Sequence, residues 1–585
     1  QLRVGGHEPG LANGRARLQI GQVGGALGQA EGAHAGADRP GRYHDDLPAG
    51  PTLGRHLGNQ LLDLGGVDLF TAAGQYAGTQ LDYQAAGFFQ RCSLHQTRLG
   101  LKATGRGGKQ NQRPGSLGHA LGQAAKKGCP AAHGAYNSPH TKPPLGSFFM
   151  KSRTLSALAA ASLAALTSIQ ADWPQWRGPG GQGHAVDARL PAEWSEVKNV
   201  TWRTELPGRG WSSPVIVGNQ IWVTAAHETL ASEEEKKERL KENTGSQPLV
   251  VLSNVRIHAI CIDKSNGKIV RDIPLLRKRN PQWVHKTNSY ASPTPIIEDG
   301  RLYSHNGSYG SACLDLKSGE VLWTNQDLWV MHENGPGGSP ILWNDLLIFH
   351  MDGSDRQFIA ALEKKTGKLA WKTRRTGEMN KNPQLKKAYG TPVVTRVRGR
   401  DVVISPAADW LYGYDPATGE ELWKVKYGSL GFSIVPKPVV ADGMVYIGTS
   451  FMRPQLLAFD ITKPKPEIAW ACKRSVPAVS SPLLVGGEIY FVSDSGGIVT
   501  CLDAKTGKEQ WRERIGGNHE ASPTYAGGRL LFHSREGETT VLQPGRNFKV
   551  LARNRLDGEH HASAAVSGNA LFLRTNKALY KIEGQ

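Results

Sequence analysis

One short pattern recurs along the chain and constrains it more than any other feature. Four regular copies place an acidic residue four positions before a glycine, and that glycine four positions before a tryptophan. They end at Gly319–Trp323, Gly367–Trp371, Gly419–Trp423 and Gly507–Trp511, and a looser fifth copy runs from Asp460 to Trp470. A period of roughly 40–50 residues is typical of an array of small, similar units.

The chemistry of the pattern predicts a tight turn between two antiparallel strands. The acidic side chain can accept hydrogen bonds from backbone amides, and the glycine tolerates the positive φ that such a turn needs. The position two residues before the acid holds Cys313, Ala361, Gly413 or Cys501, so a large group is expected to pack there. The tryptophan follows at a fixed place on the next strand, where its ring can bridge neighbouring sheets.

A second landmark precedes each copy: a small or polar residue, a proline and a short apolar strand. It occurs at Ser213-Pro214, Ser292-Pro293, Ser339-Pro340, Thr391-Pro392, Lys437-Pro438, Ser481-Pro482 and Ser522-Pro523, with a weaker eighth at Ser563-Ala564. Glycine-containing turns and further strands follow most of them. Eight units of four strands predict an all-β fold, an eight-bladed β-propeller.

The ends of the array predict how the ring closes. The last unit, 562–582, has about three strands and no tryptophan strand, whereas 199–206 resembles the missing strand. Pairing the two would remove the open sheet edge and make Trp202 a sixth docking tryptophan. Unit 1 has Arg271 in place of tryptophan and unit 7 is degenerate near Gly545, so a seven-bladed ring stays open as an alternative.

These repeats resemble the tryptophan-docking repeats of quinoprotein-like propellers. That group includes dehydrogenases that use pyrroloquinoline quinone (PQQ) and the non-enzymatic propeller of the outer-membrane β-barrel assembly machinery. The segment 172–179, Asp-Trp-Pro-Gln-Trp-Arg-Gly-Pro, is similar to exported bacterial PQQ-binding-like repeat proteins. The resemblance covers roughly 172–585 and implies the fold, but one propeller hosts many functions.

The resemblance also implies what a quinone enzyme would need. Such an enzyme holds PQQ over a flat aromatic floor, binds Ca²⁺ through Glu, Asn and Asp oxygens, and uses an Asp base. Many carry two adjacent cysteines, but this chain has neither a Cys-Cys pair nor the Cys-x-x-Cys-His haem motif. No catalytic residue and no metal-ligand spacing is evident, so no cofactor is expected. PQQ with Ca²⁺ remains an alternative that these residues do not support.

The sequence before residue 172 differs in kind from the repeats. Residues 1–149 contain no Met or Trp and 29 Gly, which indicates a non-coding or disordered upstream extension. Residues 150–171 have the parts of a signal peptide starting at Met150: a positive start, an Ala/Leu-rich run and a cleavage site before Asp172. A transmembrane anchor at 154–169 is a lesser alternative. We therefore expect a lead-in segment at 172–198, a propeller at 199–585 and a periplasmic or secreted protein.

Charge and cysteine content limit the function further. Residues 1–149 carry +7 and residues 150–171 carry +2, so +10 of the chain's net +19 belongs to residues 172–585. These positive charges are spread along turns, and no nucleic-acid motif accompanies them, so nucleic-acid binding is not expected. Of the four cysteines after residue 172, three occupy small-residue positions in different repeats. We expect them to pack as small apolar groups rather than to pair.

One insertion interrupts unit 1 near 226–254. Its middle, from Ser232 to Glu242, predicts a charged helix with i,i+4 pairs such as Glu233–Lys237. The insertion is either a solvated decoration or a lid or partner-docking arm on one face of the propeller.

The loops before each landmark face the central channel of a propeller and carry polar residues. They include His285, Asn288, Tyr290, His332, Asn334, His519, Glu520, His560 and His561. Converging His, Asn and Glu side chains could bind a metal, a sugar or an anionic small molecule. Alternatively, they line a water-filled channel and satisfy the backbone of the loops.

Three functional hypotheses follow. The first is an exported, monomeric, non-catalytic propeller that binds a protein or polysaccharide partner in the periplasm or at the cell surface, with no membrane span in the mature chain. The second is a PQQ/Ca²⁺-dependent alcohol or sugar dehydrogenase. The third is a carbohydrate or small-anion binder, or a hydrolytic enzyme, that uses the His-rich channel.

Overall fold

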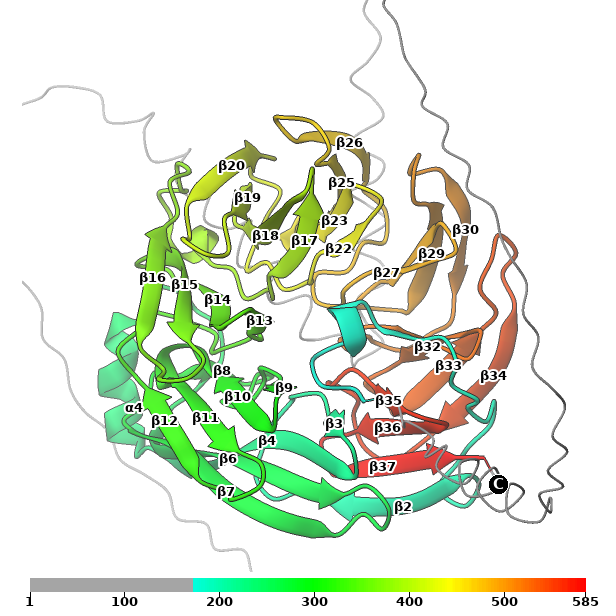
Figure 1. Ribbon diagram of the computed structural model, residues 1–585, viewed down its shortest axis with the longest axis horizontal. Helices are drawn as coiled ribbons and strands as arrows, with labels where there is room; N and C mark the ends of the chain where they lie inside the picture. The colour runs from blue at the N-terminus through cyan, green and yellow to red at the C-terminus, as the bar shows by residue number, and fades with distance from the viewer. Residues whose placement is uncertain (1–171, 585) are drawn as a thin grey trace, which may run out of the picture. The chain divides into compact units, whose positions relative to one another are not determined.

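The computed structural model describes residues 172–584, which form an eight-bladed β-propeller with one short α-helix (Figure 1). Seven blades are four-stranded antiparallel sheets and one sheet has a fifth strand. In each blade the first strand lies nearest the centre of the ring. The predicted upstream extension (1–149) and signal peptide (150–171) lie outside the described residues.

Each blade runs from an innermost to an outermost strand, in the order that follows. Blades 1 and 2 contain β3 (Val215–Val217), β4 (Gln220–Leu230), β6 (Leu252–Asp263) and β7 (Ile269–Arg279), then β9 (Ile296–Glu298), β10 (Arg301–His305), β11 (Ser311–Asp315) and β12 (Val321–Asn325). Blades 3 and 4 contain β13 (Ile341–Trp343), β14 (Leu346–Asp352), β15 (Gln357–Glu363) and β16 (Leu369–Arg374), then β17 (Val393–Val397), β18 (Arg400–Ala407), β19 (Trp410–Tyr414) and β20 (Glu421–Lys426).

Blades 5 and 6 contain β22 (Val439–Ala441), β23 (Met444–Gly448), β25 (Leu456–Asp460) and β26 (Glu467–Cys472), then β27 (Leu483–Val485), β28 (Glu488–Val492), β29 (Ile498–Asp503) and β30 (Glu509–Arg514). Blades 7 and 8 contain β31 (Thr524–Ala526), β32 (Arg529–His533), β33 (Glu538–Leu542) and β34 (Val550–Arg555), then β35 (Ala565–Ser567), β36 (Ala570–Arg574), β37 (Ala578–Glu583) and β2 (Val200–Glu205). The first long strand of the propeller, β2, therefore pairs with its last strand, β37.

Short elements complete the fold. They are β1 (His184–Ala185), which runs parallel to β31, the pair β5 (Leu249–Val250) and β8 (Val284–His285), the pair β21 (Gly431–Phe432) and β24 (Phe451–Met452), helix α4 (Glu233–Arg239), and the 3₁₀ turns η1 (Pro179–Gly181), η2 (Leu240–Glu242), η3 (Gly307–Tyr309) and η4 (Pro383–Lys386).

Tryptophan docking joins one blade to the next. The indole N–H of Trp323 on β12 donates to the carbonyl oxygen of Lys364 in the turn of blade 3 (2.9 Å). Its ring covers Gly367, where an added Cβ would lie 2.4 Å from the indole. The other indole donations run from Trp202 to Lys264, Trp371 to Pro416, Trp470 to Ala504 and Trp511 to Gly545. Turn glycines Gly419 and Gly507 lie under Trp371 and Trp470 in the same way.

The small residue of each repeat lies directly opposite its tryptophan in the strand register. Cys313 faces Trp323, Ala361 faces Trp371, Gly413 faces Trp423 and Cys501 faces Trp511. At Gly413 an added Cβ would lie 2.2 Å from the indole of Trp423. The large group expected against these positions is therefore the repeat's own tryptophan. The four cysteines of the described chain are unpaired, and burial raises the pKa of Cys313 to about 11.

Arg271 takes over the docking role in blade 1. Its guanidinium donates to the carbonyl oxygens of Leu316 (3.0 Å) and Lys317 (2.9 Å) in the turn of blade 2, beside Gly319. Because guanidinium groups donate in a planar fork, one side chain binds both carbonyls at once. A long side chain with N–H donors therefore makes the docking contact at this blade too, although the sequence departs from tryptophan there.

A ring of hydroxyl groups links the innermost ends of the blades. At six of the landmarks the backbone N–H donates to the hydroxyl of the next landmark, for example from Ser339 to Thr391 (2.9 Å) and from Ser481 to Ser522 (2.9 Å). In blade 2 this position is Thr294, whose hydroxyl accepts from Ser213 and whose backbone N–H donates to Ser339. The sequence pattern alone places this landmark two residues too early, at Ser292, because the segment contains two consecutive X-Pro pairs.

The lead-in segment occupies the axis of the ring, where Figure 1 shows it as the cyan turn at the centre. Trp173 exchanges two backbone hydrogen bonds with Ile216 of β3 (both 2.8 Å). The indole of Trp176 lies near Ser563 of blade 8, and the guanidinium of Arg177 donates to the carbonyl oxygen of Pro482 at blade 6 (2.8 Å). The chain therefore fills its own channel with residues that precede the first blade.

The insertion in blade 1 forms the predicted charged helix as α4 followed by η2. Ser232 caps α4 in a reciprocal capping box with Glu235. The ion pair within α4 joins Glu233 to Lys236 (3.3 Å) at i,i+3 spacing, rather than to Lys237 as expected. Beyond the helix, Thr244 donates to Glu333 in the loop between blades 2 and 3 (2.8 Å). The insertion is thus anchored on the loops of neighbouring blades.

Replacing Trp323 with alanine tests the docking contact. The change removes a buried ring and an indole hydrogen bond, so the free energy of unfolding should fall by about 3–5 kcal/mol. Urea denaturation of the full chain measures the loss. The matched control is Trp329→Ala, six residues away, where a 40% exposed ring should cost less than about 1 kcal/mol. Equal losses in the two variants would contradict the docking role.

The buried Lys437 predicts a pH dependence of stability. Burial, with a smaller contribution from the charge of Arg177, lowers the pKa of Lys437 to about 7. An unfolded lysine keeps its proton to about pH 10, so the unfolded state binds more protons above pH 7 and stability rises with pH. Thermal melts between pH 7 and 9 should show this rise, and Lys437→Met should remove it while stabilising the protein at pH 7. A rise that Lys437→Met leaves unchanged would refute the assignment.

Candidate functional site

Loops between successive blades bring two of the predicted residues together at the axis. Nδ1 of His561 lies 2.7 Å from a carboxylate oxygen of Glu520, and Nε2 lies 2.9 Å from one of Glu559. The imidazole also stacks on Trp211, with ring centroids 4.3 Å apart. Arg535 forms ion pairs with both carboxylates, at 3.3 and 3.5 Å. One imidazole is therefore held between two carboxylates by loops from blades 6, 7 and 8.

Several titratable groups around this cluster have shifted pKa values. Burial, with a contribution from the charge of Glu520, raises the pKa of Asp494 to about 6. Burial lowers the pKa of His285 to about 4, and the charges of Lys286 and Lys387 add to that effect. Burial lowers the pKa of Lys387 to about 8, although Glu333 opposes the shift. Perturbed groups collected on one axis are a mark of binding sites and also of structural ion-pair networks.

Other predicted residues lie in the same loops but serve the fold. The side-chain amide of Asn288 donates to the carbonyl oxygens of Asn334 (2.8 Å) and Pro336 (3.1 Å), and so ties two loops together. Tyr290 is fully buried, packs on Tyr309 and donates to Val250. His332 accepts a hydrogen bond from the backbone N–H of Ser308 at Nε2 (2.8 Å).

The histidines that precede Glu520 and His561 in sequence point into the protein. The ring nitrogens of His519 lie 3.0 and 2.9 Å from the carbonyl oxygens of His533 and Gly516. His560 is 1% exposed beside His533, and burial lowers its pKa to about 4. The structure thus groups Glu520 and His561 near His285, and places His519 and His560 among buried residues.

The axial residues do not fit a calcium–quinone site. Glu520 and Glu559 are held by His561 and Arg535, and the carboxylate of Asp494 accepts from the backbone N–H groups of Ala478 and Val479. The Trp211 ring is stacked on His561 and contacted by Arg209. Within residues 172–584, the only group of three His, Cys, Asp or Glu residues with close ligand atoms lies on blade 1 instead.

A second surface feature lies on the outer side of blades 2 and 3. A groove of about 410 Å³ is lined by Asp327, Leu328, Trp329, Arg356, Gln357, Phe358, Lys372 and Arg374. The guanidinium of Arg356 lies 5.5 Å from the Trp329 ring, and the ammonium of Lys372 lies 5.5 Å from the Phe358 ring. Its edge is formed by β16, the outermost strand of blade 3.

Sequence reasoning missed Trp211, Arg535, Asp494 and Lys387 at the axis, and Trp329 in the groove. Trp211 lies two residues before the first landmark, which was the one available signal for it. Arg535 and Asp494 come from loops within blades 7 and 6, which were not expected to face the channel. Among residues 172–584, no helix is long and apolar enough to cross a membrane.

Comparison with known proteins finds distant relatives. The outer membrane protein assembly factor BamB of Shewanella oneidensis is 22% identical over 253 residues, covering 40% of this chain and 59% of that protein. The tetrathionate hydrolase of Acidithiobacillus ferrooxidans is 21% identical over 341 residues, covering 55% and 62%. The quinoprotein alcohol dehydrogenase PedE of Pseudomonas putida is 26% identical over 271 residues, covering 37% and 40%. The chain thus spans less than two thirds of the length of each relative.

A solved structure and a family profile complete the comparison. The crystal structure of BamB from Moraxella catarrhalis matches with 13% identity and a TM-score of 0.43, covering 66% of this chain and 99% of that one. The profile of the family described as outer membrane protein assembly factor BamB matches residues 190–373, 237–408 and 407–570, which together span most of the propeller. The chain therefore belongs to this family of PQQ-like β-propeller proteins.

Proposed function

We propose that this protein is a non-catalytic propeller that binds an extended segment of a protein partner in the periplasm. The observation that carries the proposal is the groove around Trp329 on the outer side of blades 2 and 3. The proposal is supported by the names of two relatives, which are outer membrane protein assembly factors. It assigns the groove, rather than the axis, to the partner.

The side chains of the groove are those that dominate protein–protein contacts. Trp329 is 40% exposed, and Arg356 lies against its ring. Tryptophan and arginine are enriched among residues that contribute most to binding, because they bury a large area and donate hydrogen bonds. We infer that the exposed Trp329 ring, which lies in a groove beside an arginine and a phenylalanine, is the place where a side chain of the partner packs.

The basic side chains of the groove and the free edge of β16 indicate what kind of partner segment would bind. Arg356, Lys372 and Arg374 line the groove together with Asp327, and Arg356 also forms an ion pair with Asp355 (2.8 Å). An acidic segment would therefore gain from electrostatic complementarity. The outermost strand β16 has an unpaired edge, to which an extended peptide can add its own backbone hydrogen bonds. We infer a partner segment that is extended, acidic and carries one aromatic or aliphatic anchor.

The paired carboxylates at the axis and the filled centre of the ring are the reasons why we propose a non-catalytic protein. Each axial carboxylate already has cationic or backbone amide partners, and the chain's own lead-in segment fills the centre of the ring. A general base must reach a substrate proton, and a quinone needs an unobstructed floor. In this proposal Glu520, Glu559 and Asp494 hold the axial loops together rather than act as a general base or as ligands of a cofactor.

Peptide binding tests the groove. A fluorescein-labelled eight-residue peptide of alternating Glu and Val with one central Phe should bind the full chain, and added salt should weaken the complex. Trp329→Ala and Arg356→Ala should each weaken binding at least tenfold, measured by fluorescence anisotropy. Matched controls are Phe451→Ala, which removes a similarly exposed ring on blade 5, and Arg398→Ala, which removes a surface charge on blade 4.

Binding that the two control variants weaken as much as the groove variants would contradict the assignment. A lysine-for-glutamate version of the peptide should bind far more weakly. If an acidic polysaccharide competes with the peptide at the groove and binds more tightly than it, the partner is a polymer rather than a protein.

A cofactor titration tests the non-catalytic part of the proposal. PQQ with Ca²⁺ is added to the full chain while tryptophan fluorescence and melting temperature are followed. We expect neither saturable quenching nor a rise in melting temperature, because no calcium cage is formed by the axial carboxylates. Saturable quenching with a raised melting temperature would overturn the proposal in favour of a quinone-dependent dehydrogenase, and dye reduction with an alcohol would then confirm it.

A further inference from the structure

Three strands of blade 1 bring two histidines and an aspartate together on one face. Strand register places Ala225 opposite His258, and Ile260 opposite Asp272. Because side chains alternate between the faces of a strand, His227 of β4 shares the face of Ala225 and therefore of His258. Ala225 and Ile260 pack in the apolar cluster between blades 8 and 1. His227, His258 and Asp272 lie on the same face as this apolar cluster, farther along the long strands β4, β6 and β7.

The three side chains lie close enough to share one ion. One possible ligand atom from each lies within 4.8 Å of the others. The imidazole rings of His227 and His258 have centroids 4.2 Å apart and planes inclined by 51°. Nε2 of each ring is buried and has no hydrogen-bond partner among the described residues. Two unsatisfied imidazole nitrogens beside each other are costly unless something binds them.

The carboxylate sets the chemistry of one imidazole. Nδ1 of His258 lies 2.6 Å from a carboxylate oxygen of Asp272. When Nδ1–H donates to a carboxylate, the lone pair of the neutral ring is left on Nε2, which is the nitrogen a metal needs. Carboxylate–histidine–metal arrangements hold the ring in this tautomer and increase its basicity. The pair is therefore an oriented ligand rather than a surface contact alone.

We propose that His227 and His258 bind a divalent transition-metal ion of the Zn²⁺ class through Nε2, with Asp272 orienting His258. Imidazole nitrogens suit Zn²⁺, Cu²⁺ and Ni²⁺, whereas Ca²⁺ and Mg²⁺ prefer oxygen ligands. The ion would connect β4 and β6, the two strands between which the helical insertion lies. This site is independent of both the axial cluster and the groove at Trp329.

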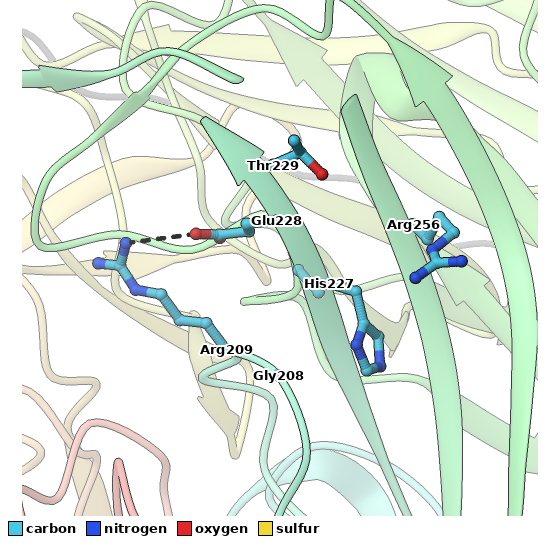
Figure 2. A pocket seen from close by; sticks show the side chains of 7 residues that line it. Gly208, Arg209, His227, Glu228, Thr229 and Arg256 are labelled. Carbon is cyan, nitrogen blue, oxygen red and sulfur yellow. Dashed lines mark ion pairs between the residues drawn. The ribbon is translucent and has the colours of Figure 1, made fainter. Parts of the chain in front are cut away.

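An open pocket of about 440 Å³ is lined by His227 and lies beside the proposed site, and Figure 2 shows its lining. Glu228 and Arg209 form an ion pair of 4.0 Å on one side of it, and Arg256 lies on the side of His227. A metal held by two protein imidazoles would fill its remaining coordination positions with water.

The positive charge of Arg256 should weaken the binding of a metal cation at the two histidines. Arg256 lies opposite His227 in the strand register, so its positive charge is close to any bound cation. Removing that charge should strengthen metal binding, whereas removing an imidazole should abolish it. If the two histidines had only a structural role, removing the charge of Arg256 would not strengthen metal binding.

The test uses the full chain stripped with a chelator and titrated with Zn²⁺ by calorimetry, and with Co²⁺ by visible absorption. We expect one equivalent to bind, with a rise in melting temperature and Co²⁺ bands typical of nitrogen and oxygen ligands. His227→Ala and His258→Ala should lose the binding, Asp272→Asn should weaken it roughly 10–100-fold, and Arg256→Gln should tighten it.

The control is His184→Gln, which changes a partly exposed histidine that contacts the carbonyl oxygen of Leu484. It should bind Zn²⁺ like the unchanged protein. Metal-free melting temperatures of all variants show whether each still folds, and Arg256→Gln keeps both ligands in case an alanine variant does not. Absence of stoichiometric binding, or binding that the two histidine variants retain, would overturn the proposal.

Discussion

The structure depends on one repeated contact, in which a long side chain on the outer strand of a blade donates a hydrogen bond to the turn of the next blade. Trp323 donates to Lys364, and its ring fills the space that a Cβ on Gly367 would occupy. Arg271 makes the same connection with a guanidinium. The contact therefore explains three features of the repeat at once: the donor, the turn glycine and the small residue opposite the ring.

The ring that these contacts build has its centre filled by the chain itself. Trp173 pairs with the innermost strand of blade 1, and Arg177 reaches the landmark of blade 6. Apolar clusters lie between neighbouring blades, so the core is distributed around the ring. Surfaces for binding are then the loops at the axis, whose carboxylates are paired, and the outer grooves, where Trp329 is exposed.

Sequence reasoning predicted the blades because their spacing, turn chemistry and alternation all agree. It predicted the site only in part, for a local reason. In an extended loop, neighbouring side chains point to opposite sides, so Glu520 and His561 reach the axis while His519 and His560 are buried. The sequence indicates which loop faces the channel but not which of two adjacent residues does. Trp211, Arg535 and Trp329 take their neighbours from different blades, and no spacing along the chain encodes such contacts.

Hydrogen exchange of the full chain with and without the acidic Glu/Val/Phe peptide shows whether the outer groove or the axis is the binding surface. If the groove is the binding surface, exchange should slow at the edge of β16 and at the backbone around Trp329, and exchange in the axial loops should be unchanged. Protection of the loops that carry Trp211, Glu520 and His561, with none at β16, would contradict it and assign the function to the axis.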